Sequence, residues 1–169
     1  LTTPQPPAET YEAVGIGQCI ITRDPTVALA AYGLGSCVAV AAWDAVARVA
    51  GVIHILLPEP PAGTVPGNPA RFATTGVPHL LREIEAAGAL RARLRVVAVG
   101  GAQMLSLLAH GPLNGIGARN VAVITACLQA AGVPLTAADL GGQVGRTLIL
   151  SVATGQVHVR ASTGATQEL

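Results

Sequence analysis

The chain has 169 residues, of which 51% are apolar and 2% aromatic, and a formal net charge of +1. This length suits one domain with a sizeable core, and the weak charge and scarce aromatic side chains argue against nucleic acid as a partner. Three cysteines without a CxxC pair predict neither a disulfide framework nor a zinc site, so we expect no metal and a cytoplasmic location.

The ends of the chain differ in composition from its middle. Residues 1–12 are rich in proline and lack the basic and apolar regions of a signal peptide, so we expect a disordered lead. A single domain is expected over residues 13–162, followed by a tail over 163–169. The uncharged stretch 27–43 approaches the length of a membrane span, but two glycines and a serine within it favour strand, turn and strand over membrane insertion.

The first half of the chain reads as strands. Short strands are expected over 13–21 and 27–32, and an antiparallel pair over 38–43 and 47–56. A turn at 44–47 would place Cys37 directly opposite His54, within reach of a cross-strand contact.

The second half mixes helices and strands. A loop rich in proline is expected over 57–69, helices over 70–87, 103–110 and 118–131, and strands over 94–99, 146–152 and 156–161. Gly76 and Pro78 are expected to break the first half of the 70–87 helix. Early hairpins, a few helices and a late hairpin predict an α+β fold with a layered mixed β-sheet or sandwich core and flanking helices.

A cysteine and a histidine carry the chemistry of the sequence. Gly33 and Gly35 favour a tight turn before Cys37, where positive φ angles are available. The backbone N–H groups of Gly35, Ser36 and Cys37 can serve as oxyanion donors. A thiol near the His54 imidazole is the minimum equipment for nucleophilic attack on an amide or ester. The alternative is structural, since free cysteines and lone histidines among apolar residues are usually core residues.

Five motifs, in order along most of the chain, resemble the CheD family of chemoreceptor glutamine deamidases. The spacing between Cys37 and His54 also agrees with that family. The motifs are GLGSCVAV (33–40), GVIHILLP (51–58), GGAQML (100–105), IGARN (116–120) and DLGG (139–142), the last standing before Arg146.

The resemblance implies hydrolysis of selected glutamine side chains of methyl-accepting chemotaxis receptors, with release of ammonia. In that family Cys37 would form a thioester and His54 would move the protons, without a metal or organic cofactor. The implied partners are the cytoplasmic region of a chemoreceptor and a CheC-type phosphatase. The implied fold is that of the CheD and cytotoxic necrotizing factor cysteine hydrolases.

One position departs from the family pattern. The family's third catalytic member is a threonine six residues before the cysteine, and this chain has Ala31 there. Ala31 would serve if the role belongs to the backbone, because a main-chain carbonyl can also orient a histidine. If the role needs a hydroxyl, Thr26 or Ser36 would have to replace it. Otherwise the chain is a receptor- or CheC-binding adaptor with weakened or no catalysis.

The remaining motifs suggest supporting residues around the site. Gly100 and Gly101 fit a tight strand-to-helix turn. Arg119 and Asn120 fit the opening of a helix, where asparagine is a common cap and the N-terminus suits a carbonyl or an anion. A third interpretation, a different cysteine amidase or protease, draws no support from an acidic or amide residue near His54 in the sequence.

Overall fold

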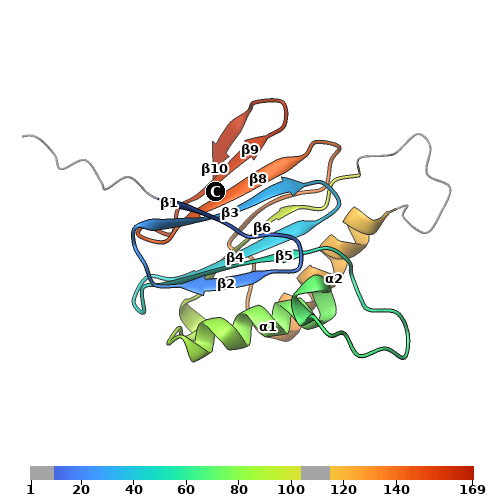
Figure 1. Ribbon diagram of the computed structural model, residues 1–169, viewed down its shortest axis with the longest axis horizontal. Coiled ribbons are helices and arrows are strands. Elements are labelled where there is room, and N and C mark those ends of the chain that lie inside the picture. Colours follow the sequence, from blue (N-terminus) through green and yellow to red (C-terminus); the bar gives the residue numbers. More distant parts are fainter. Residues whose placement is uncertain (1–9, 104–114) are drawn as a thin grey trace, which may run out of the picture.

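The computed structural model describes residues 10–103 and 115–169, which form ten strands, two α-helices and two short 3₁₀ helices (Figure 1). The strands are β1 Thr10–Ala13, β2 Cys19–Thr22, β3 Val27–Leu34, β4 Val38–Asp44, β5 Val49–Ile55, β6 Arg95–Gly100, β7 Ala137–Leu140, β8 Arg146–Ser151, β9 Val157–Ala161 and β10 Thr166–Glu168. The helices are η1 Pro69–Arg71, α1 Ala73–Ala86, η2 Arg91–Arg93 and α2 Ile116–Ala130.

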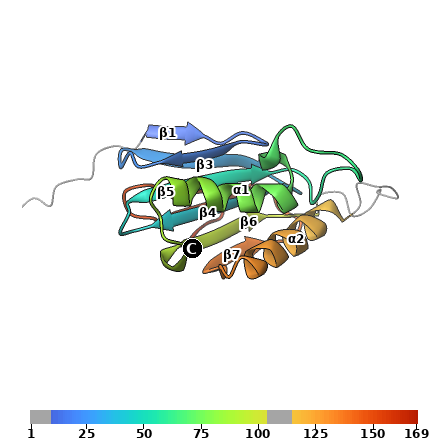
Figure 2. The ribbon, with the colours of Figure 1, turned by 90° about the horizontal axis from the view of Figure 1, so that it is seen from below.

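The strands form two sheets of five. Sheet A has the order β1-β3-β8-β9-β10, and sheet B has the order β2-β5-β4-β6-β7. Neighbouring strands are antiparallel except for β1 with β3 and β6 with β7, which are parallel. Helices α1 and α2 pack against the outer face of sheet B (Figure 2). The predicted α+β layered fold is confirmed, with the layers in the order helices, sheet B and sheet A.

Strand β4 shows why the central strands are apolar on both faces. The side chains of Val38 and Val40 pack among the helices, while those of Ala39 and Ala41 pack between the two sheets. Successive side chains of a strand point to opposite faces, so a strand buried on both faces needs an uninterrupted apolar run. The uncharged stretch 27–43 therefore contributes to the core of a sandwich.

Helix α1 is continuous although Gly76 and Pro78 lie within it. The side chains of Leu80 and Ile84 are fully buried against sheet B, and this packing outweighs the weak propensity of the first turns. A Cβ at position 76 would lie 3.0 Å from Ile53 Cδ1, so glycine lets the helix approach β5 closely. The predicted break in the helix is wrong.

Other differences from the sequence prediction lie at the sheet edges. The stretch 13–21 is two strands in different sheets, joined by residues 14–18, rather than one strand. Strands β7 and β10 were not expected, and β10 lies in the stretch 163–169 predicted as a tail. Both are short and partly exposed, so they lack the apolar pattern that marks a buried strand. The helix predicted over 103–110 lies almost wholly outside the described residues.

Candidate active site

Cys37 lies where the chain crosses from one sheet to the other. Strand β3 ends at Leu34 in sheet A, and β4 begins at Val38 in sheet B. The crossing begins at Gly33, whose φ of 66° is in the left-handed region that glycine adopts without steric penalty. Gly35, expected to need a positive φ as well, does not have one. The thiol is thereby held at a corner of the sandwich, with Cys37 only 7% exposed.

His54 lies on β5 beside the cysteine, on the same face of sheet B. It pairs with Ala39 of β4, so the predicted direct pairing of His54 with Cys37 is wrong by two residues. The turn between the strands lies at 45–48, one residue later than expected, and this displaces the register by two. A displacement of two keeps side chains on the same face. Cys37 and His54 are therefore diagonal neighbours that face the space between the sheets.

The imidazole of His54 is oriented by a backbone carbonyl. Its Nδ1 lies 3.1 Å from the carbonyl oxygen of Val14, which can only accept a hydrogen bond, so we assign the ring proton to Nδ1. Nε2 then carries a lone pair. This nitrogen is buried and has no hydrogen-bond partner among the described residues. His54 thus holds its acceptor nitrogen ready for a proton.

The connection from β1 to β2 encloses the backbone of His54. The His54 N–H donates to the Gln18 carbonyl at 3.0 Å, and the Gly17 N–H donates to the His54 carbonyl at 2.8 Å. The side chain of Asn68 donates from Nδ2 to the Gly17 carbonyl at 2.8 Å. Since Val14 belongs to the same connection, these bonds hold its carbonyl against the imidazole. Val14 and Asn68 were not predicted, because their contacts with this site carry no local sequence signal.

Ala31 lies inside sheet A, fully buried, paired with Leu148 of β8. The carbonyl that accepts from the His54 ring belongs to Val14, so the expected backbone role of Ala31 as that acceptor is not observed. Nor does Thr26 replace the family hydroxyl, since its Oγ1 donates to a neighbouring carboxylate at 2.7 Å. The carbonyl that orients the imidazole in this structure is therefore that of Val14.

Burial favours the neutral forms of the Cys37 thiol and the His54 imidazole. It raises the pKa of the Cys37 thiol above its ordinary value, although the residue's own backbone N–H opposes that shift. Burial likewise lowers the pKa of His54, against the opposing effect of the bond to Val14. At neutral pH the pair is therefore a thiol and a neutral imidazole, which suits the imidazole to act as a base.

Two backbone N–H groups of the cysteine turn are open. The Gly35 N–H donates to the Gly33 carbonyl at 3.0 Å, which removes Gly35 from the predicted oxyanion donors. The N–H groups of Ser36 and Cys37 donate to no other residue within residues 10–103 and 115–169, and the Cys37 N–H lies beside its own thiol. Donors of this kind can stabilise the negative charge that develops on a carbonyl oxygen under attack. The candidate oxyanion donors are therefore Ser36 and Cys37.

Gly100 and Gly101 form a close turn against the cysteine. The Gly101 N–H donates to the Cys37 carbonyl at 2.8 Å, and the Ala102 N–H donates to the Gly35 carbonyl at 2.7 Å. Gly100 has a φ of 121°, and a Cβ there would lie 2.2 Å from the Cys37 carbonyl oxygen. These glycines thus support the turn that carries Cys37, while the helix of the predicted strand-to-helix turn lies outside the described residues.

Arg119 and Asn120 have different surroundings. Arg119 is exposed and pairs with Glu59 of the 57–69 loop, with 3.1 Å between Nη2 and Oε1. Asn120 is the fifth residue of α2 rather than its cap, and it is fully buried. Its Nδ2 donates to the carbonyls of Ser36 and Leu56, at 2.8 and 3.1 Å. The structure therefore brings Asn120, but not Arg119, to the backbone around the cysteine and the histidine.

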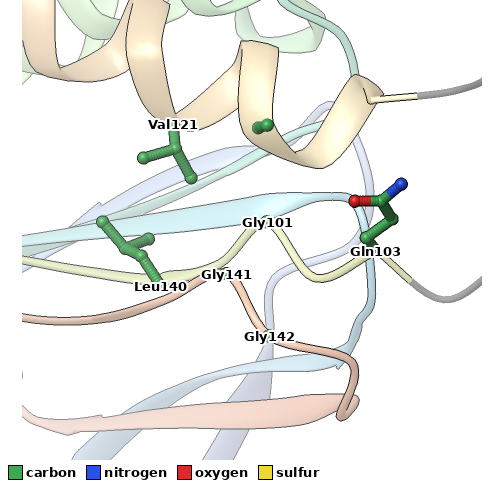
Figure 3. Close-up of a pocket in the computed structure, with 7 residues that line it drawn as sticks. Gly101, Gln103, Val121, Leu140, Gly141 and Gly142 are labelled. Carbon is green, nitrogen blue, oxygen red and sulfur yellow. The ribbon is translucent and has the colours of Figure 1, made fainter. Parts of the chain in front are cut away.

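A pocket of about 310 Å³ opens beside the Gly100–Gly101 turn (Figure 3). Figure 3 shows Val121 of α2 and Leu140 of β7 on its walls, with Gly101 between them. Because the Gly101 N–H donates to the Cys37 carbonyl, the pocket lies next to the turn that holds Cys37 in place. It is lined by Gly101, Gln103, Ala118, Val121, Leu140, Gly141 and Gly142.

Among the described residues, no group of three or more histidine, cysteine, aspartate or glutamate side chains is placed to hold a metal ion. None of the helices in the described part of the chain is both long and apolar enough to cross a membrane.

Known proteins resemble this chain over most of its length. A family model described as CheD chemotactic sensory transduction matches residues 56–161. A protein of Symbiobacterium thermophilum is 42% identical over 149 residues, which cover 88% of this chain and 90% of the relative. A protein of Desulfitobacterium hafniense is 40% identical with coverages of 88% and 91%, and one of Pyrococcus abyssi is 40% identical with coverages of 89% and 91%. Each bears the name "Probable chemoreceptor glutamine deamidase CheD".

A solved structure, the Bacillus licheniformis hypothetical protein YfiH, overlaps 82% of this chain and 61% of its own, with 15% identity and a TM-score of 0.43. That degree of likeness supports no conclusion about activity. The family model and the relatives, in contrast, agree over most of the sequence, and this chain belongs to the CheD family.

Proposed function

We propose that this chain is a protein-glutamine deamidase that converts selected glutamine side chains of chemoreceptors to glutamate through a thioester on Cys37. The single observation that carries the proposal is the state of His54. Its Nδ1 is held by the Val14 carbonyl, and its Nε2 is buried without a partner in the described structure, on the face of sheet B that Cys37 shares. The names of the relatives support glutamine as the substrate.

The first half of the reaction forms the thioester. Sγ of Cys37 attacks the carbonyl carbon of the glutamine amide, and the thiol proton passes to Nε2 of His54. The N–H groups of Ser36 and Cys37 stabilise the oxyanion, and His54 returns the proton to the nitrogen as ammonia leaves. Nε2 is not hydrogen-bonded to the thiol in the free protein, so this transfer needs a closer or better aligned approach once substrate binds, as catalytic hydrogen bonds often do.

The second half uses water. His54 Nε2 takes a proton from water, and the hydroxide adds to the thioester carbonyl. The C–S bond then breaks, His54 returns its proton to the sulfur to regenerate the thiol, and the carboxylic acid that forms ionises to glutamate. Throughout both halves the other ring proton stays on Nδ1, which donates to the Val14 carbonyl. That bond favours the ring when it becomes charged, so it stabilises the imidazolium that each step creates.

The adaptor alternative depends on the missing hydroxyl at Ala31. Because the ring proton of His54 already has an acceptor in Val14, the absence of that hydroxyl does not by itself leave the imidazole unoriented. This observation favours the deamidase over the adaptor. A CheC-type phosphatase as partner and a cytoplasmic location stay predictions from the family resemblance.

The test is peptide mass spectrometry of a chemoreceptor cytoplasmic fragment incubated with the chain. We expect glutamine-to-glutamate conversion that disappears in Cys37→Ala and persists in Cys127→Ala, since Cys127 lies on α2 and packs on the helix side of sheet B. Conversion that persists in Cys37→Ala would refute the thioester. Binding of the fragment without conversion by the unmodified chain would favour the adaptor.

A further inference from the structure

Asn120 connects the two segments that carry the nucleophile and the base. It lies on α2, on the other face of sheet B from the thiol, and no part of it is exposed. Both hydrogen bonds leave from one nitrogen, Nδ2, toward Ser36 just before Cys37 and toward Leu56 two residues after His54. One amide group thus joins the beginning of β4 to the end of β5.

The bond to Ser36 fixes the direction of an oxyanion donor. The Ser36 carbonyl and the Cys37 N–H belong to one planar trans peptide unit, so they point in opposite directions. When Asn120 holds the carbonyl on the helix side, the Cys37 N–H must point away from α2. The preceding unit is held similarly, because Ala102 donates to the Gly35 carbonyl and so directs the Ser36 N–H.

The surroundings of Asn120 fit a side chain whose amide serves to donate two hydrogen bonds. Gly117, one turn earlier on α2, would place a Cβ 2.5 Å from the Gly101 carbonyl oxygen, so glycine lets the helix approach the turn. Asn120 Oδ1, in contrast, is buried without a partner among the described residues. A buried unpaired acceptor is unfavourable, and an apolar side chain would avoid it. What asparagine adds at this position is therefore the pair of N–H donors on its Nδ2.

We propose that Asn120 is a positioning residue that aims the Cys37 N–H at the oxyanion of the substrate. This proposal rests on the proposed function and names a residue that acts through the backbone rather than on the substrate. The side chain of Asn120→Leu has nearly the same size but no donor, so the Ser36 peptide is no longer held. Asn120→Ser is a second variant that keeps one donor in a smaller side chain.

Two reagents separate this role from general support of the thiol. Acylation of Cys37 by p-nitrophenyl acetate passes through an oxyanion, whereas alkylation by iodoacetamide does not. In Asn120→Leu we expect the acylation rate and the kcat of deamidation to fall about 100-fold or more, the effect of losing one oxyanion donor. The alkylation rate and its pH profile should be unchanged, KM should change little, and Asn120→Ser should fall between.

The control is Thr125→Ala, on the same helix, whose hydroxyl donates to the Val121 carbonyl and does not reach the turn. Circular dichroism and Tm are measured for every variant. Unchanged acylation in folded Asn120→Leu, or alkylation that falls in parallel with acylation, would overturn the proposal. A chain that acylates Cys37 but deamidates no receptor would contradict the proposed function alone, because the acylation rates still test Asn120.

Discussion

The two ends of strand β4 treat buried polar groups in opposite ways. At its last residue, Asp44, a fully buried carboxylate accepts from Arg93 and from the N–H groups of Val46, Ala47 and Leu90. At the other end, His54 Nε2 and Asn120 Oδ1 are buried without a partner in the described residues. Buried polar groups are nearly always paired in proteins. The buried carboxylate at the Asp44 end is thus fully hydrogen-bonded, whereas two buried polar atoms at the Cys37 end have no partner among the described residues.

Removing the imidazole of His54, the proposed base, should give the largest fall in kcat. In His54→Ala no group remains to move the thiol proton, so we expect kcat for deamidation to fall about 10²- to 10⁴-fold. Steady-state assays of receptor deamidation measure it. His158→Ala is the matched control, since His158 is exposed on β9 and should leave kcat unchanged. A loss confined to KM would contradict the role of His54 as a base.

Removing the Asp44 carboxylate should lower the free energy of unfolding and leave kcat for deamidation unchanged. Asp44→Ala removes the partner of Arg93 and the acceptor of three backbone N–H groups, so we expect the free energy of unfolding to fall by about 3 kcal/mol. Urea unfolding followed by circular dichroism measures the change. Under conditions where the variant is folded, kcat should be near that of the unmodified chain, and a large fall in kcat would show that the two ends are coupled.

The same carboxylate should make stability depend on acid. The hydrogen bonds from Arg93 and the backbone hold the pKa of Asp44 well below its usual value. Its contribution is therefore complete above about pH 4, the ordinary pKa of an unfolded aspartate, and is lost as the pH falls below it. Unfolding free energies measured between pH 7 and pH 3 should fall more steeply in the unmodified chain than in Asp44→Asn. Equal slopes would contradict the assignment.

A side chain at position 100, next to the Cys37 carbonyl, should have a moderate effect on stability and activity. Ala at position 100 would place its Cβ against the Cys37 carbonyl, and overpacking of this kind destabilises by about 2 kcal/mol. We expect Gly100→Ala to lower both Tm and kcat. Gly132→Ala shares a positive φ, at 70°, but has nothing within 4 Å of its Cβ, so it should lower Tm and preserve kcat. Full activity in Gly100→Ala would show that the cysteine turn tolerates displacement.

The smallest effect is expected from Asn68→Ala. It loses one hydrogen bond to the connection that carries Val14, and a single neutral bond contributes about 1 kcal/mol. We therefore expect a fall in kcat of less than about tenfold, measured in the same deamidation assay. A fall as large as that of His54→Ala would mean that the Val14 carbonyl depends on Asn68 alone.

The chemistry of the site could be predicted from sequence more completely than its geometry. Cys37 in a glycine turn and His54 in a strand carry side-chain signals, and the family motifs reinforce them. The register was wrong because the β4–β5 turn ends at Arg48, a non-glycine residue with a φ of 52°, which gives no glycine signal at that position. The acceptor for His54 was missed because a backbone carbonyl such as that of Val14 has no residue identity.

The fold shows the same limit. Strands β4 and β6 were predictable because both faces are buried, whereas β7 and β10 are partly exposed and short. The division of 13–21 between two sheets depends on residues 14–18 crossing beside His54, which is decided by packing of distant segments. Asn120 was placed near the site by its motif, but its position inside α2 and its carbonyl partners follow only from the fold.

The central claim, a thioester on Cys37 formed with a receptor glutamine, is tested most directly by trapping it with hydroxylamine. A receptor fragment incubated with the chain and hydroxylamine should acquire hydroxamate at the deamidated glutamines, because the nucleophile intercepts the acyl group that water would otherwise release. Peptide mass spectrometry identifies the product, and Cys37→Ala should give none. Glutamate without any hydroxamate, formed equally by Cys37→Ala, would contradict the account.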